Sequence, residues 1–240
     1  MKIFAPPASS CYNIPTDRNV FQDRNGVKLI MDIKERRDFD QEAEQWDANP
    51  GRVKLANEVA DAILRTTVLS REMNALDFGC GTGLVTLRLQ PFVKTITGED
   101  SSEGMLDLLR GKVRAMGLTN VQTRLVDFEK KDLREGAYNL IVSSMTLHHV
   151  PDTAALFSQW YRLLAPRGTL CFADLDSEDG SFHGDNAGVF HLGFDRSKLK
   201  ALLQEDGFHD FLDTTAASLS KDIPGKGMKE FSVFLITAKK

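Results

Sequence analysis

The chain has 240 residues, a length that fits one generous domain able to bury a core without disulfides or metal ions. Its three cysteines lack the spacing of a disulfide framework or a zinc site, and the formal net charge of -4 argues against a nucleic-acid surface. No apolar run approaches the roughly 20 residues of a membrane span. We therefore expect a soluble, cytoplasmic protein that acts on a small molecule, with no membrane or nucleic-acid partner. The sequence leaves the oligomeric state open.

The first part of the chain differs in pattern from the rest. Residues 1–34 are rich in Pro, Ser, Asn and Asp and show no sustained helical or strand period, which predicts an irregular N-terminal extension. From residue 35 the pattern becomes helical, with one apolar face before Asn49-Pro50-Gly51 and another after it. We predict a single domain over residues 35–240, whose residues 35–70 form two cap helices.

From Asn74 onward, short apolar runs alternate with helical stretches. This alternation is typical of a parallel sheet with helices on both faces. Seven strands are predicted, at residues 75–78, 93–97, 121–126, 140–144, 169–173, 211–215 and 231–238. The last two lie close together in the chain, so we expect them to form an antiparallel hairpin.

The first of these strands ends in a glycine-rich turn that opens a helix. Residues 75–83 read ALDFGCGTG, and glycines at 79, 81 and 83 let backbone N–H groups approach a ligand closely. The spacing is not the G-x-G-x-x-G of dinucleotide sites, and no lysine follows as in a Walker loop. A nucleotide-like ligand without a diphosphate is predicted. The alternative is a tight connection that binds nothing.

Acidic residues stand at the ends of the neighbouring strands, where open parallel sheets bind their ligands. Asp100 follows the second strand and can accept both hydroxyls of a ribose, although an Asp there also caps helices, and Glu99 is a competing acid. Asp127 and Phe128 follow the third strand, where a solvated loop is the alternative. Carboxylates would repel a diphosphate, so this set favours a cationic ligand.

The fourth strand leads into the segment MTLHHVPD, which places His148 and His149 at the same edge. A histidine with a pKa near 6.5 suits proton removal at neutral pH. Asp174, at the end of the fifth strand, could orient such a base or bind substrate. A structural role that only supports the neighbouring loops is the alternative for the histidine pair.

Taken in order, these segments resemble the motifs of the class I S-adenosylmethionine-dependent methyltransferases that act on small molecules. The resemblance rests on DFGCGTG, on the D-x-S-x-x-M-L pattern at residues 100–106, on Asp127-Phe128 and on LHHVPD. It implies a doubly wound, Rossmann-like α/β fold with strand order 3-2-1-4-5-7-6, mostly parallel with an antiparallel last strand. It also implies S-adenosylmethionine as methyl donor, S-adenosylhomocysteine as product, and oxygen, nitrogen or carbon of a small molecule as acceptor.

The resemblance assigns roles to individual residues. It places the methionine end of the cofactor near Asp77, the ribose at Asp100, and the adenine near Met105 and Asp127, while His148, His149 and Asp174 serve the reaction. The implied cofactor-binding residues are Asp77, Gly79, Cys80, Gly81, Gly83, Asp100, Ser101, Met105, Asp127, Phe128 and Ser143.

Two further segments are expected to enclose the substrate. Residues 176–194 are rich in glycine, contain His183 and His191, and lie where the family inserts a substrate lid. We expect Trp46 and Arg52 to close the opposite side of the substrate site. Trp46 belongs to the F-x-x-x-A-x-x-W-D region at residues 39–47, and Arg52 lies just beyond it. A plain packing role for Trp46 is equally open. The histidines lack H-x-x-x-H spacing, so no metal is expected.

Two other functions remain open from the sequence. The chain could bind the cofactor as a non-catalytic regulatory subunit, or, with less support, methylate RNA. One departure from the family concerns Pro166-Arg167-Gly168, where Pro-Gly-Gly is usual. We expect Arg167 to avoid the left-handed conformation that a glycine would allow.

Overall fold

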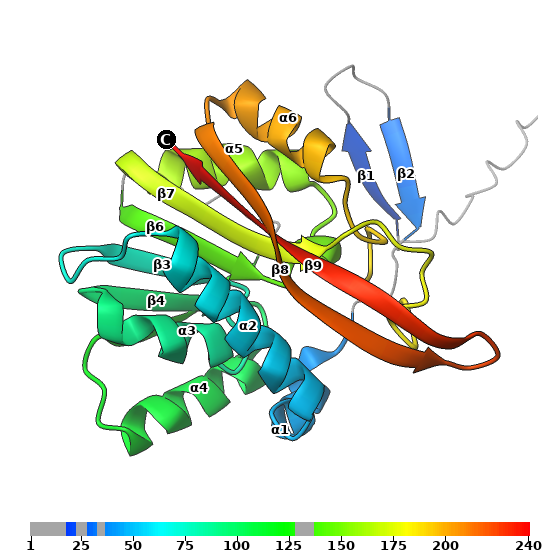
Figure 1. Cartoon of the computed structure of the whole chain (residues 1–240), viewed down its shortest axis with the longest axis horizontal. Helices are drawn as coiled ribbons and strands as arrows, with labels where there is room; N and C mark the ends of the chain where they lie inside the picture. Colours follow the sequence, from blue (N-terminus) through cyan, green and yellow to red (C-terminus); the bar gives the residue numbers. More distant parts are fainter. Residues whose placement is uncertain (1–17, 23–27, 33–36, 128–136) are drawn as a thin grey trace, which may run out of the picture. The chain divides into compact units, whose positions relative to one another are not determined.

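The computed structural model describes residues 18–22, 28–32, 37–127 and 137–240 (Figure 1). Its contacts divide the chain into two units, Met1–Arg37 and Asp38–Lys240. The first unit contains two antiparallel strands, β1 (Arg18–Gln22) and β2 (Lys28–Asp32), in a segment whose sequence shows no strand period. All the remaining helices and strands belong to the second unit.

The second unit is built on a seven-stranded sheet with the order β5-β4-β3-β6-β7-β9-β8. Five strands pair in parallel, and β9 is antiparallel to both of its neighbours, β7 and β8. This is the predicted doubly wound order 3-2-1-4-5-7-6, and it is confirmed. The strands are β3 (Asn74–Phe78), β4 (Thr95–Asp100), β5 (Val121–Leu125), β6 (Tyr138–Ser144), β7 (Leu164–Leu175), β8 (His209–Ile223) and β9 (Gly227–Lys239).

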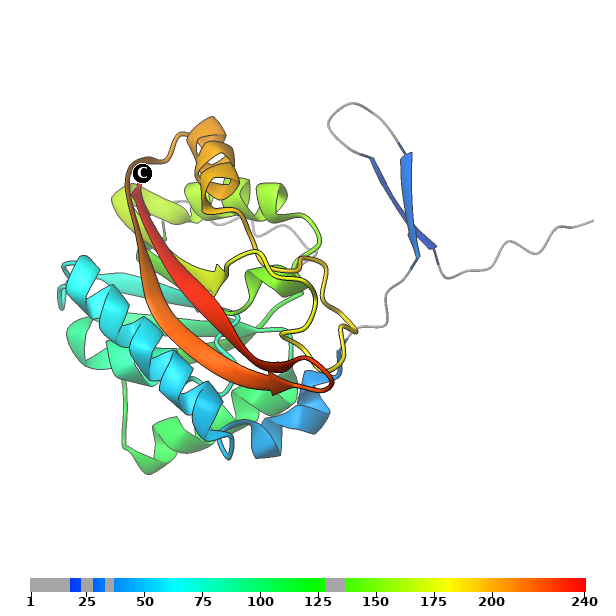
Figure 2. The ribbon, with the colours of Figure 1, turned by 45° about the vertical axis from the view of Figure 1, so that its right-hand side comes forward.

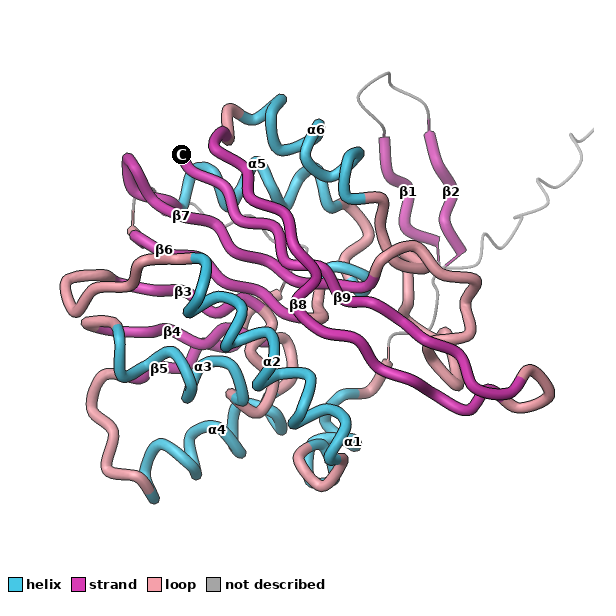
Figure 3. The backbone as a smooth tube through the Cα atoms, viewed as in Figure 1, coloured by secondary structure: helices cyan, strands magenta, loops and turns pink. Residues whose placement is uncertain are grey.

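Helices cover both faces of this sheet (Figures 1 and 3). The helices are α1 (Phe39–Trp46), α2 (Pro50–Thr66), α3 (Leu84–Leu89), α4 (Glu103–Ala115), α5 (Thr153–Leu163) and α6 (Arg196–Asp206), with short 3-10 turns η1 (Gln90–Phe92) and η2 (Leu147–His149). Neighbouring residues of β3 point to opposite faces: Ala75 packs in the core under α2, and Leu76 packs in the core under α5. None of the helices in the described ranges is long and apolar enough to cross a membrane.

Polar caps begin the helices that follow the strand ends. Ser102 starts α4, Asp152 starts α5 and Asp195 starts α6, and each side chain accepts a hydrogen bond from a backbone N–H of the first turn. At the other end, Gly117 and Gly207 have φ of 63° and 103° and terminate α4 and α6. The loops that precede α4, α5 and α6 therefore each end at a helix start that is stabilised by a capping side chain.

The hairpin of β8 and β9 is much longer than predicted. The sequence indicates strands only at 211–215 and 231–238, whereas β8 spans His209–Ile223 and β9 spans Gly227–Lys239. Beyond Val233, where pairing with β7 ends, the two strands pair only with each other as far as Ile223 and Gly227 (Figure 2). This outer part alternates apolar residues with many polar ones, so its apolar period is weak in the sequence.

The expectation for Arg167 is wrong. Its φ is 63°, within the left-handed region, and the β6–β7 register shifts beside it. Arg167 is exposed, so its side chain meets no packing obstacle, and the conformation costs about 1–2 kcal/mol. The position in this turn that requires glycine is Gly168, because a Cβ there would lie only 2.8 Å from the carbonyl oxygen of Ala165.

Candidate active site

The glycine turn, residues 79–83, joins β3 to α3 and has three positive φ angles, 71° at Gly79, 54° at Gly81 and 83° at Gly83. A Cβ at Gly79 would lie 2.2 Å from Oγ1 of Thr146, and one at Gly83 would lie 2.3 Å from Cδ1 of Leu109. At Gly81 the nearest atom would be 4.0 Å away. Gly79 and Gly83 are therefore glycines because the turn is tightly packed. Gly81 instead presents its backbone to open space that a ligand can occupy.

We expect Gly83→Ala to lower the free energy of unfolding by about 2–4 kcal/mol, because it adds a clash with the buried Leu109 to left-handed strain. Gly111→Ala is the matched control: Gly111 lies inside α4 with nothing within 4 Å of a new Cβ, so alanine should stabilise the protein by about 0.5–1 kcal/mol. Urea denaturation of both variants measures the difference. Equal effects would contradict this account of the turn.

Asp100 and Glu99, the two adjacent acids at the end of β4, have different partners. The Asp100 carboxylate accepts hydrogen bonds from the backbone N–H of Gly81 at 2.7 Å and of Ser102 at 2.9 Å. Glu99 forms an ion pair with Arg124, its neighbour across β5. Successive strand residues point their side chains to opposite faces, so of the two carboxylates only that of Asp100 bonds the glycine turn. The backbone carbonyl of Glu99 accepts hydrogen bonds from the N–H groups of Gly79 and Cys80. Burial raises the pKa of Asp100, although the N–H groups of Ser102 and Gly81 act to lower it.

Asp77 lies buried beneath the glycine turn. The hydroxyl of Thr86 donates a hydrogen bond of 2.5 Å to its carboxyl group. The pKa of Asp77 is raised to about 7: burial raises it most, the bond from Thr86 lowers it, and the nearby charge of Asp100 adds to the rise. A positive charge bound next to the turn would favour ionisation of this carboxyl group.

Helix α1 is fastened at both ends to the loops around the glycine turn. Near its start, Asp40 accepts hydrogen bonds from the hydroxyl of Ser102 at 2.5 Å and from the N–H of Gly104 at 2.7 Å. Just after its end, Asp47 accepts one from the hydroxyl of Thr82 at 2.6 Å. The sequence analysis missed both anchoring roles. Asp47 is part of the quoted motif, but its partner is far away in the chain, and only the fold brings them together.

One aromatic side chain of α1, that of Phe39, contacts a histidine. The ring of Phe39 meets that of His149 edge to face, with centroids 5.1 Å apart, and lies 6.0 Å from Trp46. The guanidinium of Arg52 lies 3.8 Å from the centroid of Trp46 and also pairs with Glu42. Trp46 and Arg52, both predicted to close the site, thus contact each other, and Phe39 contacts His149.

The histidine turn, residues 145–150, follows β6 and contains η2. It begins at Met145, whose φ of 57° is unusual for a residue with a side chain. This bend brings Thr146 against the glycine turn, where its hydroxyl donates to the carbonyl of Gly79 at 3.3 Å. The histidines and the glycine turn are therefore neighbours, as the strand-end argument predicts.

His148 and Asp174 form a fully buried pair. Nδ1 of His148 lies 2.7 Å from Oδ1 of Asp174, whose other oxygen accepts the backbone N–H of His148 at 3.3 Å. Burial alone would raise the pKa of Asp174, but His148 and the backbone N–H of Leu175 outweigh it and lower the pKa. Asp174 is thus the ionised acceptor, so Nδ1 of His148 carries the proton that points at it.

His149 lies beside this pair and is half-buried. Its ring centroid is 4.1 Å from that of His148, and the ring of His183 is 5.0 Å from His148. Nδ1 of His149 lies 2.8 Å from the carbonyl oxygen of Gly188. In the part of the chain that the structure describes, no group of His, Cys, Asp and Glu has the arrangement of a metal site.

The predicted lid, residues 176–194, is held at its base and near its middle. At the base, the guanidinium of Arg196 forms two hydrogen bonds to Asp176, at 2.7 Å and 2.6 Å. Near the middle, Lys221 of β8 donates to the carbonyl of Phe182 at 2.8 Å, and the ring of Phe182 packs against that of Phe231. The lid thus lies along the β8–β9 hairpin (Figure 2).

The other predicted residues are spread around this edge. Ser143 is buried and its hydroxyl donates to the carbonyl of Phe78, and Met105 and Cys80 are also buried near the turn. Ser101 and Asp127 are exposed. His191 bonds the carbonyl of Val150 through Nε2 at 2.9 Å. Phe128 lies outside the described residues.

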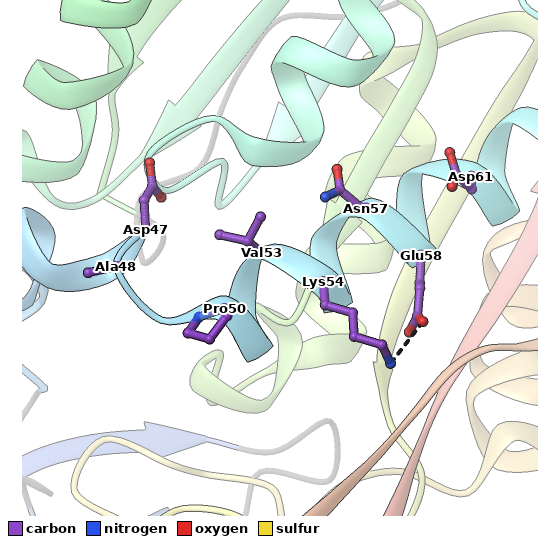
Figure 4. A pocket seen from close by; sticks show the side chains of 8 residues that line it. All are labelled: Asp47, Ala48, Pro50, Val53, Lys54, Asn57, Glu58 and Asp61. Atoms are coloured by element: carbon purple, nitrogen blue, oxygen red, sulfur yellow. Dashed lines mark ion pairs between the residues drawn. The ribbon is translucent and has the colours of Figure 1, made fainter.

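A separate hollow runs along α2 (Figure 4) and shares only Asp47 with the residues above. An ion pair of 3.0 Å between Lys54 and Glu58 lies along it. Its lining is Asp47, Ala48, Pro50, Val53, Lys54, Asn57, Glu58 and Asp61, all on or beside α2. Because the glycine turn and the histidines do not border it, we do not assign it to the candidate active site.

Comparisons with known proteins identify the domain. Residues 76–172 match the family model described as a methyltransferase domain. An uncharacterized methyltransferase of Schizosaccharomyces pombe is 33% identical over 135 residues, covering 50% of this chain and 48% of that protein. A ubiquinone biosynthesis O-methyltransferase of Coxiella burnetii is 27% identical over 150 residues, covering 61% and 63%. The matches thus span about half to just under two thirds of these relatives.

Solved structures share the fold at low identity. A SAM-dependent methyltransferase from Aquifex aeolicus superposes with a TM-score of 0.62 at 18% identity, over 83% of this chain and 97% of that one. A phosphoethanolamine N-methyltransferase of Haemonchus contortus, solved with S-adenosylmethionine, gives 0.64 at 15% identity, over 89% and 62%. The matched model identifies residues 76–172 as a methyltransferase domain, and these likenesses, together with the strand order, show that the second unit has the fold of the class I S-adenosylmethionine-dependent methyltransferases.

Proposed function

We propose that this protein transfers the methyl group of S-adenosylmethionine to a hydroxyl group of a small molecule. The residues at the glycine turn suit this cofactor: Gly81 borders open space, Asp100 offers a carboxylate to ribose hydroxyls, and Asp77 offers one to a cationic end group. Met105 and Asp127 would lie on the adenine side. When bound, the cofactor supplies an electrophilic methyl group on a sulfonium.

The histidine arrangement is the observation that carries the choice of a hydroxyl acceptor. Nδ1 of His148 faces an oxygen of Asp174 and Nδ1 of His149 faces the carbonyl oxygen of Gly188, so their Nε2 atoms are the basic nitrogens. A hydroxyl group must lose its proton during methylation, and a positioned imidazole contributes typically 100- to 10,000-fold to such a step. His149 is the less buried of the two, and we assign it as the base. His148, held by Asp174, supports it.

The direct test incubates the full chain with methyl-labelled S-adenosylmethionine and a cell extract that contains both small molecules and RNA. Label should appear in a small-molecule product, as an ether or ester methyl group. Label on RNA, or none with cofactor bound, would instead support the RNA or regulatory alternatives. The measurement is needed because the fold alone does not set the reaction: the cyclase SpnF superposes with a TM-score of 0.59 at 19% identity.

The raised pKa of Asp77 predicts a pH dependence of cofactor binding. In the ligand-free protein this carboxyl group is mostly protonated below its pKa of about 7, and a bound cation favours the ionised form. Affinity for S-adenosylmethionine should therefore rise about tenfold between about pH 5.5 and pH 7, with proton release on binding. Calorimetry in buffers of different ionisation enthalpy measures that release. Asp77→Asn should abolish the slope, and a slope that persists in this variant would contradict the assignment.

A further inference from the structure

The lid docks directly on the histidine turn through its backbone. The N–H groups of Phe190 and His191 donate to the carbonyl of His148 at 2.8 Å and 3.3 Å. The side chain of His191 donates in turn to the carbonyl of Val150 at 2.9 Å. Burial lowers the pKa of His191, so this ring is neutral near pH 7. In the docked arrangement, residues 190–191 of the lid are therefore held to the turn by three hydrogen bonds between uncharged groups.

A further bond of the docked lid reaches the imidazole of His149. The carbonyl of Gly188 lies 2.8 Å from Nδ1, and Gly188 itself is buried with a φ of 68°. A carbonyl oxygen only accepts hydrogen bonds, so Nδ1 of His149 must carry the proton in this arrangement. The left-handed backbone at position 188 is the one that glycine adopts without strain. The direction of this carbonyl therefore depends on the glycine.

The two histidines have orienting oxygens of different origin. Asp174, which orients His148, is a fully buried side chain at the end of β7 and pairs in register with Phe234. The carbonyl of Gly188, which orients His149, belongs to the lid. The first acceptor is fixed in the sheet, while the second is present only when the lid is docked.

We infer that Gly188 is a positioning residue: its carbonyl holds His149 as the Nδ1–H tautomer, so docking of the lid prepares Nε2 to accept a proton. The catalytic meaning of this inference rests on the proposed function, whereas the tautomer of His149 does not depend on it. The bond from His149 to the carbonyl of Gly188 couples closure of the lid over the substrate to the readiness of the base. A proton is then removed only in the enclosed site.

Nitrogen NMR of the full chain with 15N-labelled histidine tests this without substrate, because the two ring nitrogens report which one carries the proton. The chain has 5 histidines, and the pair of ring-nitrogen signals that disappears in His149→Gln belongs to His149. The ratio of Nδ1–H to Nε2–H tautomer should fall about fivefold in Gly188→Ala, the size of one ordinary hydrogen bond.

Two lid glycines serve as matched controls. Gly180 has a φ of 84°, so Gly180→Ala adds comparable backbone strain away from His149, and Gly184→Ala adds a methyl group with nothing within 4 Å. Both should leave the tautomer ratio of His149 unchanged. An unchanged ratio in Gly188→Ala, or an equal change in Gly180→Ala, would overturn the inference.

A second pair of variants keeps the test independent of how Gly188→Ala folds. The side-chain amide of His149→Asn can still donate a proton to the carbonyl of Gly188, whereas His149→Leu cannot. Hydrogen exchange of the Phe190 amide should be about fivefold faster in the Leu variant than in the Asn variant. Equal exchange in both would show that this bond does not hold the lid. Neither readout uses turnover, so a failed methylation assay leaves this result standing, and the reverse also holds.

Discussion

Replacing His149 by glutamine should lower the rate of methyl transfer by about 100- to 10,000-fold, because a positioned base is lost. The affinity for S-adenosylmethionine should stay within about twofold, since the carboxylates and glycines of the cofactor turn are untouched. Single-turnover kinetics give the rate, and calorimetry gives the affinity. This split between rate and affinity is what a base produces.

The control is His209→Gln, which changes a histidine at the exposed start of β8. It should leave both quantities unchanged. If His149→Gln instead weakens cofactor binding as much as it slows transfer, His149 supports the cofactor loop structurally, and the assignment of the base is wrong.

The second large effect concerns Asp100. Asp100→Ala should weaken binding of S-adenosylmethionine by about 100- to 10,000-fold, because two hydrogen bonds to a charged acceptor are worth about 1.5–3 kcal/mol each. The variant also removes the acceptor for the N–H of Gly81, so circular dichroism must show that the fold is intact.

Glu99→Gln is the matched control, since it alters the adjacent acid of the same strand. Glu99 pairs with Arg124 and faces away from the glycine turn, so its neutral variant should bind the cofactor within a few fold of the wild type. If Glu99→Gln weakens cofactor binding more than Asp100→Ala does, then Glu99 is the acid that binds the ribose and Asp100 only caps α4.

The sequence predicts those parts of the molecule that depend on neighbours in the chain. The glycine turn, the acids at the strand ends and the His148-His149 segment are short patterns, and each lies at the end of a strand that its apolar run marks. Strand order followed from the resemblance to a family. The strand-end rule then places these segments at one edge, as the structure has them.

Other features depend on contacts between distant segments, and the sequence does not show them. The anchors of α1 join Asp40 to Ser102 and Asp47 to Thr82, and the bond from His149 ends on a backbone carbonyl at Gly188. Every residue has a backbone carbonyl, so no sequence pattern identifies the one that accepts this bond. The strand over 95–100 also ends later than the predicted 93–97 because its last residues are charged, which conceals their burial in the sheet.

Calorimetric titration of the wild-type chain with S-adenosylmethionine, and separately with NAD, tests the central claim most directly. The account predicts that the chain binds one equivalent of S-adenosylmethionine and that S-adenosylhomocysteine competes for the same site, because open space at Gly81 next to Asp77 and Asp100 suits a cationic nucleoside. It predicts no measurable binding of NAD, whose diphosphate those carboxylates would repel. Tight binding of NAD with none of S-adenosylmethionine would contradict the account.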